Sequence, residues 1–189
     1  MITPKLQKQE GFALLMALIV VGTVVSVGLT VLDITLKQLR LSTGARDSEI
    51  AFHAANAGAE CIRYWRRERQ NQFETGANVD IDCFGESRTL NNDFAGPEPR
   101  TYRYTTSFSW SPVPNDNRCS IVTVLTINPE FDDAITVASI GNYLPGYPGV
   151  SKTCQVGGRC TLISVQGYNR SCAGSFPIGT VQREVLLEL

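Results

Sequence analysis

One uncharged stretch near the start of the chain constrains the fold more than any other feature. Residues 12–32 contain no Asp, Glu, Lys or Arg, and Asp33 ends the stretch. About 21 residues of α-helix span about 31 Å, which matches a bilayer core of about 30 Å. A cleaved secretory signal is the rival interpretation, but its apolar core is usually about 7–15 residues, with an A-x-A-like site just beyond it. The nearest such triplet, Ala55-Asn56-Ala57, lies far past the stretch. We therefore predict a transmembrane helix that stays on the protein.

The cysteines indicate on which side of the membrane the rest of the chain lies. All six follow the apolar stretch: Cys61, Cys83, Cys119, Cys154, Cys160 and Cys172. An even number of cysteines in a small domain beyond a membrane segment indicates disulfides formed outside the cytoplasm. A zinc site is disfavoured because there is no C-x-x-C pair and only one histidine, His53. We expect a single-pass protein with an extracytoplasmic C-terminal domain, and no metal or other cofactor.

Small residues interrupt the apolar stretch at helical spacing. Gly22, Ser26 and Thr30 recur every four residues. In lipid, small residues at this spacing let two helices approach closely, so Gly22 and Ser26 are candidates for helix packing. The alternative is a lone anchor in which these residues have no partner.

The helical pattern continues beyond the membrane segment. No proline occurs between Pro4 and Pro97, and apolar or small residues keep a helical rhythm up to Trp65 among polar neighbours. The small residues Ala51, Ala54 and Gly58 would let another layer lie close against this upper half. The pattern leaves open whether the helix bends at Gly44.

The C-terminal half has the pattern of a β-sheet. Residues 67–100 are rich in Asn, Asp, Gly and Pro and are expected to form a connecting loop region. The expected strands are residues 101–110, 119–127, 134–140, 160–168 and 180–189. Short links between strands favour an antiparallel sheet, and the amphipathic half of the helix would cover one face. The predicted fold class is α+β.

The expected strands suggest one pairing of the cysteines out of the fifteen that six allow. Cys119 opens one strand and Cys172 follows the end of another, so the two would meet if these strands are antiparallel neighbours. The pairing hypothesis is completed by Cys61 with Cys83 and Cys154 with Cys160.

The start of the apolar stretch carries a family resemblance. A short charged leader, Gly11, Phe12 and a long apolar helix together resemble the class III signal of type IV pilins and pseudopilins. Residues 46–58, RDSEIAFHAANAG, resemble the R-x-x-E-x-A-F-x-A-A-E-A-G segment of PilX-type minor pilins. The resemblance covers about residues 7–62 and implies the pilin-like fold, a long N-terminal helix packed on an antiparallel sheet.

The resemblance also implies processing and partners. In that family a prepilin peptidase cuts after the glycine, and the new N-terminal phenylalanine is usually N-methylated. The implied partners are this peptidase, other pilin or pseudopilin subunits, and the assembly machinery of the bacterial inner membrane. The implied organisation is a leader over residues 1–11, a spine helix over 12–66 with its transmembrane part at 12–32, a connecting region over 67–100 and a sheet head over 101–189.

Two positions depart from the family pattern. The fifth residue of a mature major pilin is glutamate, which is thought to neutralise the terminal amine of a neighbouring subunit, whereas this chain has Met16 there. Asn56 replaces a second family glutamate. The departure at Met16 predicts a minor, tip or initiating subunit rather than the bulk of a fibre.

No catalytic constellation is evident in the sequence, so we expect a structural and assembly role and not an enzyme. His53 fits a helix flank, and Asn169-Arg170-Ser171 is a formal glycosylation sequon. Glu130, Asp132 and Asp133 could bind Ca²⁺ through their oxygens, but they better fit a solvated turn. The basic segment 63–69 could contact DNA or an acidic partner, or could simply offset a helix dipole. A net charge of −1 disfavours direct nucleic-acid binding. The loop 143–149 is a candidate contact surface, and the alternative function is a membrane-anchored binding domain that never assembles.

Overall fold

The structure is a computed structural model that describes residues 10–93, 100–111, 117–129, 133–172 and 176–189. The chain divides into two compact units, Met1–Ala45 and Arg46–Leu189. Expectations about residues 1–9, including the charged part of the leader, lie outside the described residues.

The first unit consists of the N-terminal part of helix α1 (Glu10–Glu68). The helix forms because the stretch contains no proline and few polar groups that compete for backbone hydrogen bonds. Its threonine hydroxyls bond to carbonyl oxygens of the preceding turn: Thr23 donates to Val20 O at 2.8 Å and Thr30 donates to Ser26 O at 2.9 Å. These polar groups are therefore satisfied within the apolar helix itself.

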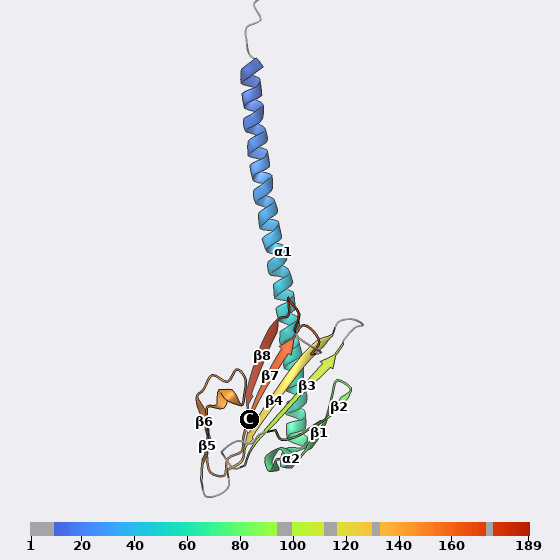
Figure 1. Ribbon diagram of the computed structural model, residues 1–189, viewed down its shortest axis with the longest axis vertical. Coiled ribbons are helices and arrows are strands. Elements are labelled where there is room, and N and C mark those ends of the chain that lie inside the picture. Colours follow the sequence, from blue (N-terminus) through green and yellow to red (C-terminus); the bar gives the residue numbers. More distant parts are fainter. Residues whose placement is uncertain (1–9, 94–99, 112–116, 130–132, 173–175) are drawn as a thin grey trace, which may run out of the picture. The chain divides into compact units, whose positions relative to one another are not determined.

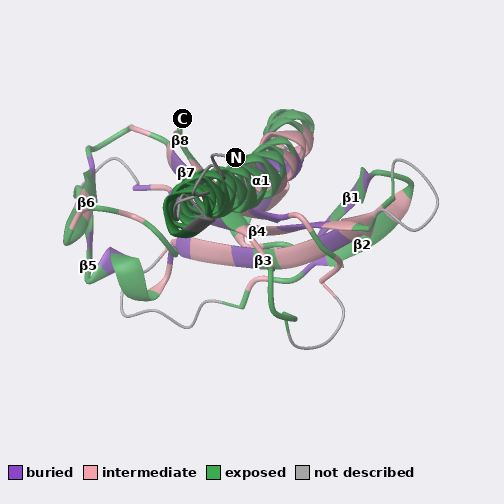
Figure 2. Ribbon diagram, turned by 90° about the horizontal axis from the view of Figure 1, so that it is seen from above, coloured by how far each residue is buried: buried purple, intermediate pink, exposed green. Residues whose placement is uncertain are grey.

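The second unit is built around a four-stranded antiparallel sheet (Figure 1). Its strands, in spatial order, are β3 (Thr101–Trp110), β4 (Arg118–Ile127), β7 (Cys160–Tyr168) and β8 (Gln182–Glu188). Each neighbouring pair is antiparallel. Figure 2 shows that buried and half-buried residues follow one another along β3 and β4.

Smaller elements flank this sheet. They are the helix α2 (Gln70–Thr75), the hairpin β1 (Val79–Cys83) with β2 (Glu86–Leu90), the hairpin β5 (Ile135–Ala138) with β6 (Ser151–Cys154), and the 3-10 turn η1 (Ile140–Asn142). Both hairpins form separate two-stranded sheets.

Successive side chains of a strand point to opposite faces of the sheet. Residues of the central strands β4 and β7 therefore belong to two different hydrophobic cores. On one face, Val122 and Val165 pack in a core with Ile62 of α1 and with residues of β1 and β2. On the other face, Leu125 and Leu162 pack with residues of β5, β6 and η1. The sheet is therefore covered on one face by α1 from Arg46 onward and at one end of the other face by the β5–β6 hairpin.

The predicted fold class is confirmed: the protein is α+β, with one long N-terminal helix and an antiparallel sheet in a pilin-like arrangement. The prediction of a connecting loop over residues 67–100 is wrong, because this segment holds α2, β1 and β2. The alternation Val-Asp-Ile-Asp-Cys at 79–83 is a strand pattern, but the surrounding Asn, Asp and Gly obscured it. The expected strand 134–140 is also too long, since β5 ends at Ala138 and lies outside the main sheet.

Candidate functional site

The candidate processing junction lies at the start of α1. The helix begins at Glu10, so Gly11 and Phe12 are both helical and exposed, and 66% of Phe12 is accessible. Among the described residues, α1 is the one helix that is long and apolar enough to cross a membrane. The predicted segment is thus a single exposed apolar helix, which is compatible with a membrane anchor.

The predicted packing residues of this segment are open to their surroundings. A Cβ atom added at Gly22 would meet no other atom within 4 Å. Ser26 and Met16 are exposed as well. Packing of Gly22 and Ser26 against the helix of another subunit therefore stays a prediction.

The small residues of the upper helix lie directly against the sheet, as the sequence predicts. Ala51, Ala54 and Gly58 are buried, and Ser120 of β4 donates a hydrogen bond from its Oγ to Ala54 O at 2.7 Å. A Cβ at Gly58 would lie 2.9 Å from side-chain atoms of both Ser120 and Val165. Small side chains at these positions are what allows helix and sheet to approach closely.

The sheet supplies a matching small residue that sequence reasoning missed. A Cβ on Gly167 of β7 would fall on backbone atoms of Ala51 and Ala55. Nearby, Arg183 of β8 donates from Nε to Ser48 Oγ at 2.7 Å. The helix is therefore held on β4, β7 and β8 by close backbone packing and by polar contacts at its edge.

All six cysteines are paired as the sequence suggests. The disulfides join Cys61 to Cys83, Cys119 to Cys172 and Cys154 to Cys160, with Cα–Cα distances of 6.0, 5.1 and 5.9 Å. The first ties α1 to β1, where Trp65 also donates from Nε1 to Asp82 O at 2.8 Å.

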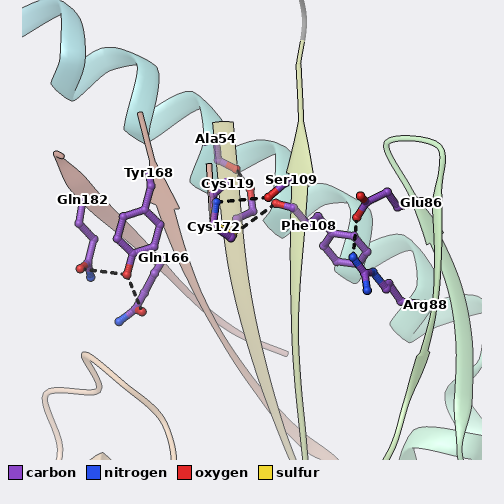
Figure 3. The surroundings of a disulfide bond; sticks show 11 residues. Ala54, Glu86, Arg88, Phe108, Ser109, Cys119, Gln166, Tyr168, Cys172 and Gln182 are labelled. Carbon is purple, nitrogen blue, oxygen red and sulfur yellow. Dashed lines mark hydrogen bonds and ion pairs between the residues drawn. A yellow bond between two sulfur atoms is a disulfide. The ribbon is translucent and has the colours of Figure 1, made fainter. Parts of the chain in front are cut away.

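The second disulfide fixes the segment that follows β7 to the sheet (Figure 3). The backbone N–H of Cys172 donates to Ser109 Oγ at 3.2 Å. Beside it, the Tyr168 hydroxyl donates to Gln166 or Gln182, each at 3.2 Å, and burial raises the pKa of Tyr168. This end of the sheet is built for stability, and no described group there is a nucleophile poised for chemistry.

The remaining candidates from the sequence have structural explanations. His53 is exposed, 3.7 Å from Glu49 on the same helix face. The sequon residue Asn169 is already used, because its Oδ1 accepts from the Val181 N–H at 2.8 Å and its Nδ2 donates to Gly179 O. Asn56 is half-buried on α1. Residues 130–132 of the acidic loop lie outside the described residues.

The loop 143–149 is attached to the edge strand β8. Burial raises the pKa of Tyr147, and the neighbouring Glu188 carboxylate raises it further. Lys152 of β6 donates to Glu188 at 2.7 Å, and this hydrogen bond lowers the pKa of Glu188. Leu144 is fully buried, so the loop is anchored by its apolar side chain as well as by these polar contacts.

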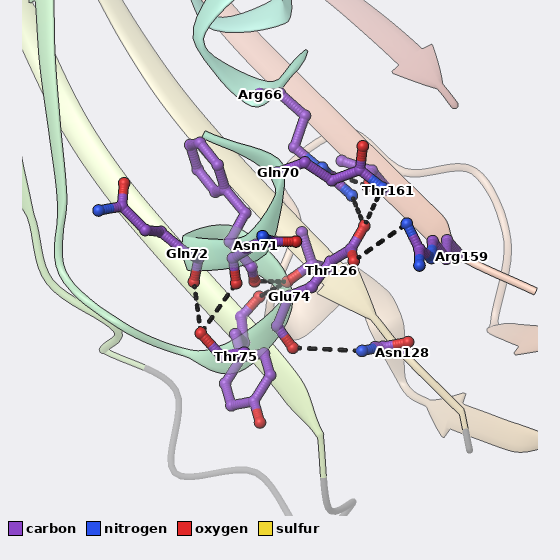
Figure 4. A network of polar contacts seen from close by, with 12 residues as sticks. Arg66, Gln70, Asn71, Gln72, Glu74, Thr75, Thr126, Asn128, Arg159 and Thr161 are labelled. Atoms are coloured by element: carbon purple, nitrogen blue, oxygen red, sulfur yellow. Dashed lines mark hydrogen bonds and ion pairs between the residues drawn. The ribbon is translucent and has the colours of Figure 1, made fainter. Parts of the chain in front are cut away.

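An arginine-rich cleft lies where the C-terminal end of α1 meets α2 and β7 (Figure 4). At its base, Arg66 donates from Nη2 to Glu74 at 2.9 Å and from Nε to Thr161 at 3.0 Å. Both charged side chains are nearly buried, with 8% of Arg66 and 7% of Glu74 exposed. Arg159 reaches Glu74 from the opposite side at 3.5 Å.

Sequence reasoning placed Arg66 in a basic segment at a helix end but could not identify its partners. Glu74 lies in the segment expected to be a loop, and Thr161 is far away in the sequence. Only the position of β7 against the helix brings them together.

Comparison with known proteins identifies no relative: no protein-family model, no curated protein and no solved structure matches this chain. Within the described parts of the chain, no group of three or more His, Cys, Asp or Glu side chains could hold a metal ion. The arrangement is therefore best described as an exposed apolar helix joined to a disulfide-bonded α+β unit.

Proposed function

We propose that the chain is a minor or initiating subunit of a type IV pilus or related pseudopilus, with a structural role in assembly. A prepilin peptidase in the bacterial inner membrane would remove residues 1–11, and the apolar helix would then join a filament. The sheet unit would face outward, outside the cytoplasm.

One observation carries this proposal: a single helix, α1, serves both units. It presents apolar side chains without a partner over residues 12–32, and from Ala51 onward it buries small residues against a sheet. An exposed apolar helix of this length needs either lipid or other helices around it. The helix of a filament subunit has each of these environments in succession: lipid before assembly, and the helices of neighbouring subunits after it.

The N-terminus of the mature protein tests the processing step. We expect intact mass and terminal peptide sequencing, after expression with a prepilin peptidase, to give a chain that starts at N-methylated Phe12. Gly11→Val should block this cut, whereas the matched variant Gly22→Val should leave it unchanged. A chain that keeps Met1 in the presence of active peptidase would contradict the proposal.

Met16 favours the second candidate function, a membrane-anchored extracytoplasmic binding domain that never assembles. Without a carboxylate at this position, the terminal amine of a neighbouring subunit would lack a charge partner in an apolar environment, which carries a desolvation cost. The two candidates differ at the processing step, because only the first is cut at Gly11.

Met16 also gives a test of the assembly step. If the missing carboxylate limits incorporation, Met16→Glu should raise the amount of protein that sediments with sheared filaments. Met16→Leu, which keeps the side chain apolar, should leave that amount unchanged. Equal amounts for both variants would mean that Met16 does not limit assembly.

A further inference from the structure

The arginine-rich cleft has a charge imbalance that the fold itself does not require. Four guanidinium groups line it, from Arg63, Arg66, Arg67 and Arg159, and the one carboxylate side chain in the lining is Glu74. The cleft has a volume of about 290 Å³. Its charged side chains therefore carry an excess of positive charge around a space that can hold one or two side chains.

Glu74, the one carboxylate side chain in the cleft, is already fully engaged, and Leu189 also lines the cleft. Glu74 Oε1 accepts from Arg66 and from Gln70, each at 2.9 Å, and Oε2 faces Arg159 (Figure 4). The charges of Arg66 and Glu74 thus cancel at the floor of the cleft. The guanidinium groups of the other arginines lie at its rim. Arg63 meets only the exposed Glu60, at 3.6 Å, and Arg67 has no ion pair among the described residues.

A helix dipole does not account for this cluster. Cations at the last turn of α1 would interact favourably with the helix C-terminus, which explains Arg66 and Arg67. Arg159 comes from the link between β6 and β7, far along the chain, yet it points to the same carboxylate. Two separate elements therefore bring positive charge to one cleft.

We infer that this cleft binds an acidic segment of a partner polypeptide, with Arg63, Arg67 and Arg159 receiving its carboxylates. Arginine suits this role because its planar guanidinium donates two parallel hydrogen bonds to one carboxylate. A nucleic acid is a poorer match, because the cleft is small and the chain as a whole carries a net charge of −1. This inference goes beyond the proposed function, since the cleft lies within the second unit and does not depend on cleavage at Gly11.

The experiment uses the full chain in detergent micelles and a fluorescein-labelled hexaglutamate peptide as the probe. We expect saturable binding by fluorescence anisotropy, weaker at high salt, and no binding of a hexaglutamine peptide. Arg67→Glu should weaken binding about tenfold or more, because it replaces an attraction at the rim with a repulsion. Arg170→Glu makes the same charge change at an exposed position beyond the opposite end of β7 and should leave binding nearly unchanged.

A second measurement avoids substitutions altogether. Phenylglyoxal modifies accessible arginines, and mass spectrometry of the wild-type chain should show that hexaglutamate protects Arg63, Arg67 and Arg159 but not Arg170. The inference is overturned if hexaglutamate does not bind, if both charge reversals weaken binding equally, or if protection is uniform. Tighter binding of an oligodeoxythymidylate of equal charge would also overturn it, because the partner would then be a nucleic acid. All these results are read on uncleaved protein, so they are independent of the processing test.

Discussion

Gly167 is the residue on which the close approach of helix and sheet most depends. It lies on β7 opposite Ala51 and Ala55, and its place against their backbone leaves no room for even one methyl group. The helix contributes small residues from its side, so the contact depends on small residues in both elements.

We predict that Gly167→Ala lowers the free energy of unfolding by about 2–3 kcal/mol, because the added methyl group must push α1 off the sheet. Denaturant unfolding of the full chain in detergent, followed by circular dichroism, measures this. Gly44→Ala is the matched control, since a Cβ there meets nothing within 4 Å. Equal stability of the two variants would show that the helix can shift without cost.

Tyr104 is a buried residue whose titration should be visible in the stability of the protein. It is fully buried, and its hydroxyl donates to the carbonyl oxygen of Gln72 or Ala77 at 3.2 or 3.1 Å. Burial and, to a smaller extent, the nearby Tyr102 raise the pKa of Tyr104 and Arg66 lowers it, so that the pKa is raised to about 12.

Because the folded-state pKa lies above the unfolded value of about 10, this contribution to stability is complete below pH 10. It is lost as the pH rises toward 12, by about 2–3 kcal/mol. We therefore expect the free energy of unfolding to fall more steeply over this range in the wild type than in Tyr104→Phe. Parallel pH profiles for the two proteins would contradict the assignment.

At the scale of elements, the Cys61–Cys83 disulfide is what joins the β1–β2 hairpin to α1 covalently. It closes a longer loop than Cys154–Cys160, with sequence separations of 22 and 6. Longer loops lose more entropy in the unfolded chain when they are closed.

We predict that replacing both Cys61 and Cys83 by Ala costs about 3 kcal/mol, and that the same change at Cys154 and Cys160 costs about 2 kcal/mol. Thermal melts of the two double variants give the order. Limited proteolysis should also cut the β1–β2 hairpin faster in the first variant only. A reversed order would mean that the shorter bridge has a larger role in the β5–β6 core.

The elements differ in how well the sequence predicts them. Strands β3 and β7 are predicted with their observed bounds, because β-branched and aromatic residues fill them and turn residues flank them. The sequence does not predict the β1–β2 hairpin, in part because its turn places Phe84 at φ 58°. Hairpin turns of this conformation usually have Asn, Asp or Gly there, so phenylalanine does not indicate a turn.

The sequence predicts those parts of the helix–sheet contact and of the arginine-rich cleft whose residues are close together in the chain. Ala51, Ala54 and Gly58 share one helix face, so the sequence alone shows that something packs there. That the partner is Gly167, or that Arg66 meets Glu74 and Thr161, follows from the order of strands in the sheet. No periodicity in the sequence encodes that order.

At the scale of the whole molecule, the apolar half of α1 should decide where the protein resides. Val21 lies near the middle of residues 12–32 and is exposed. A lysine at the centre of a membrane helix costs about 3 kcal/mol. We predict that Val21→Lys lowers the fraction of protein in carbonate-washed membranes, whereas Val21→Leu leaves it unchanged. Equal membrane fractions would show that other parts of the chain hold it there.

Two of the three disulfides also set how the molecule responds to tension between its two ends. A pull on α1 passes along the helix to Cys61 and crosses directly to Cys83, so residues 62–82 carry none of it. It then follows the chain to Cys119 and crosses to Cys172, which removes residues 120–171 from the path. Strands β4 and β7, helix α2 and every arginine that lines the cleft are consequently shielded from stretching. Under tension, only residues 84–118 and 173–189 can extend beyond the helix, and the centre of the sheet unit stays closed.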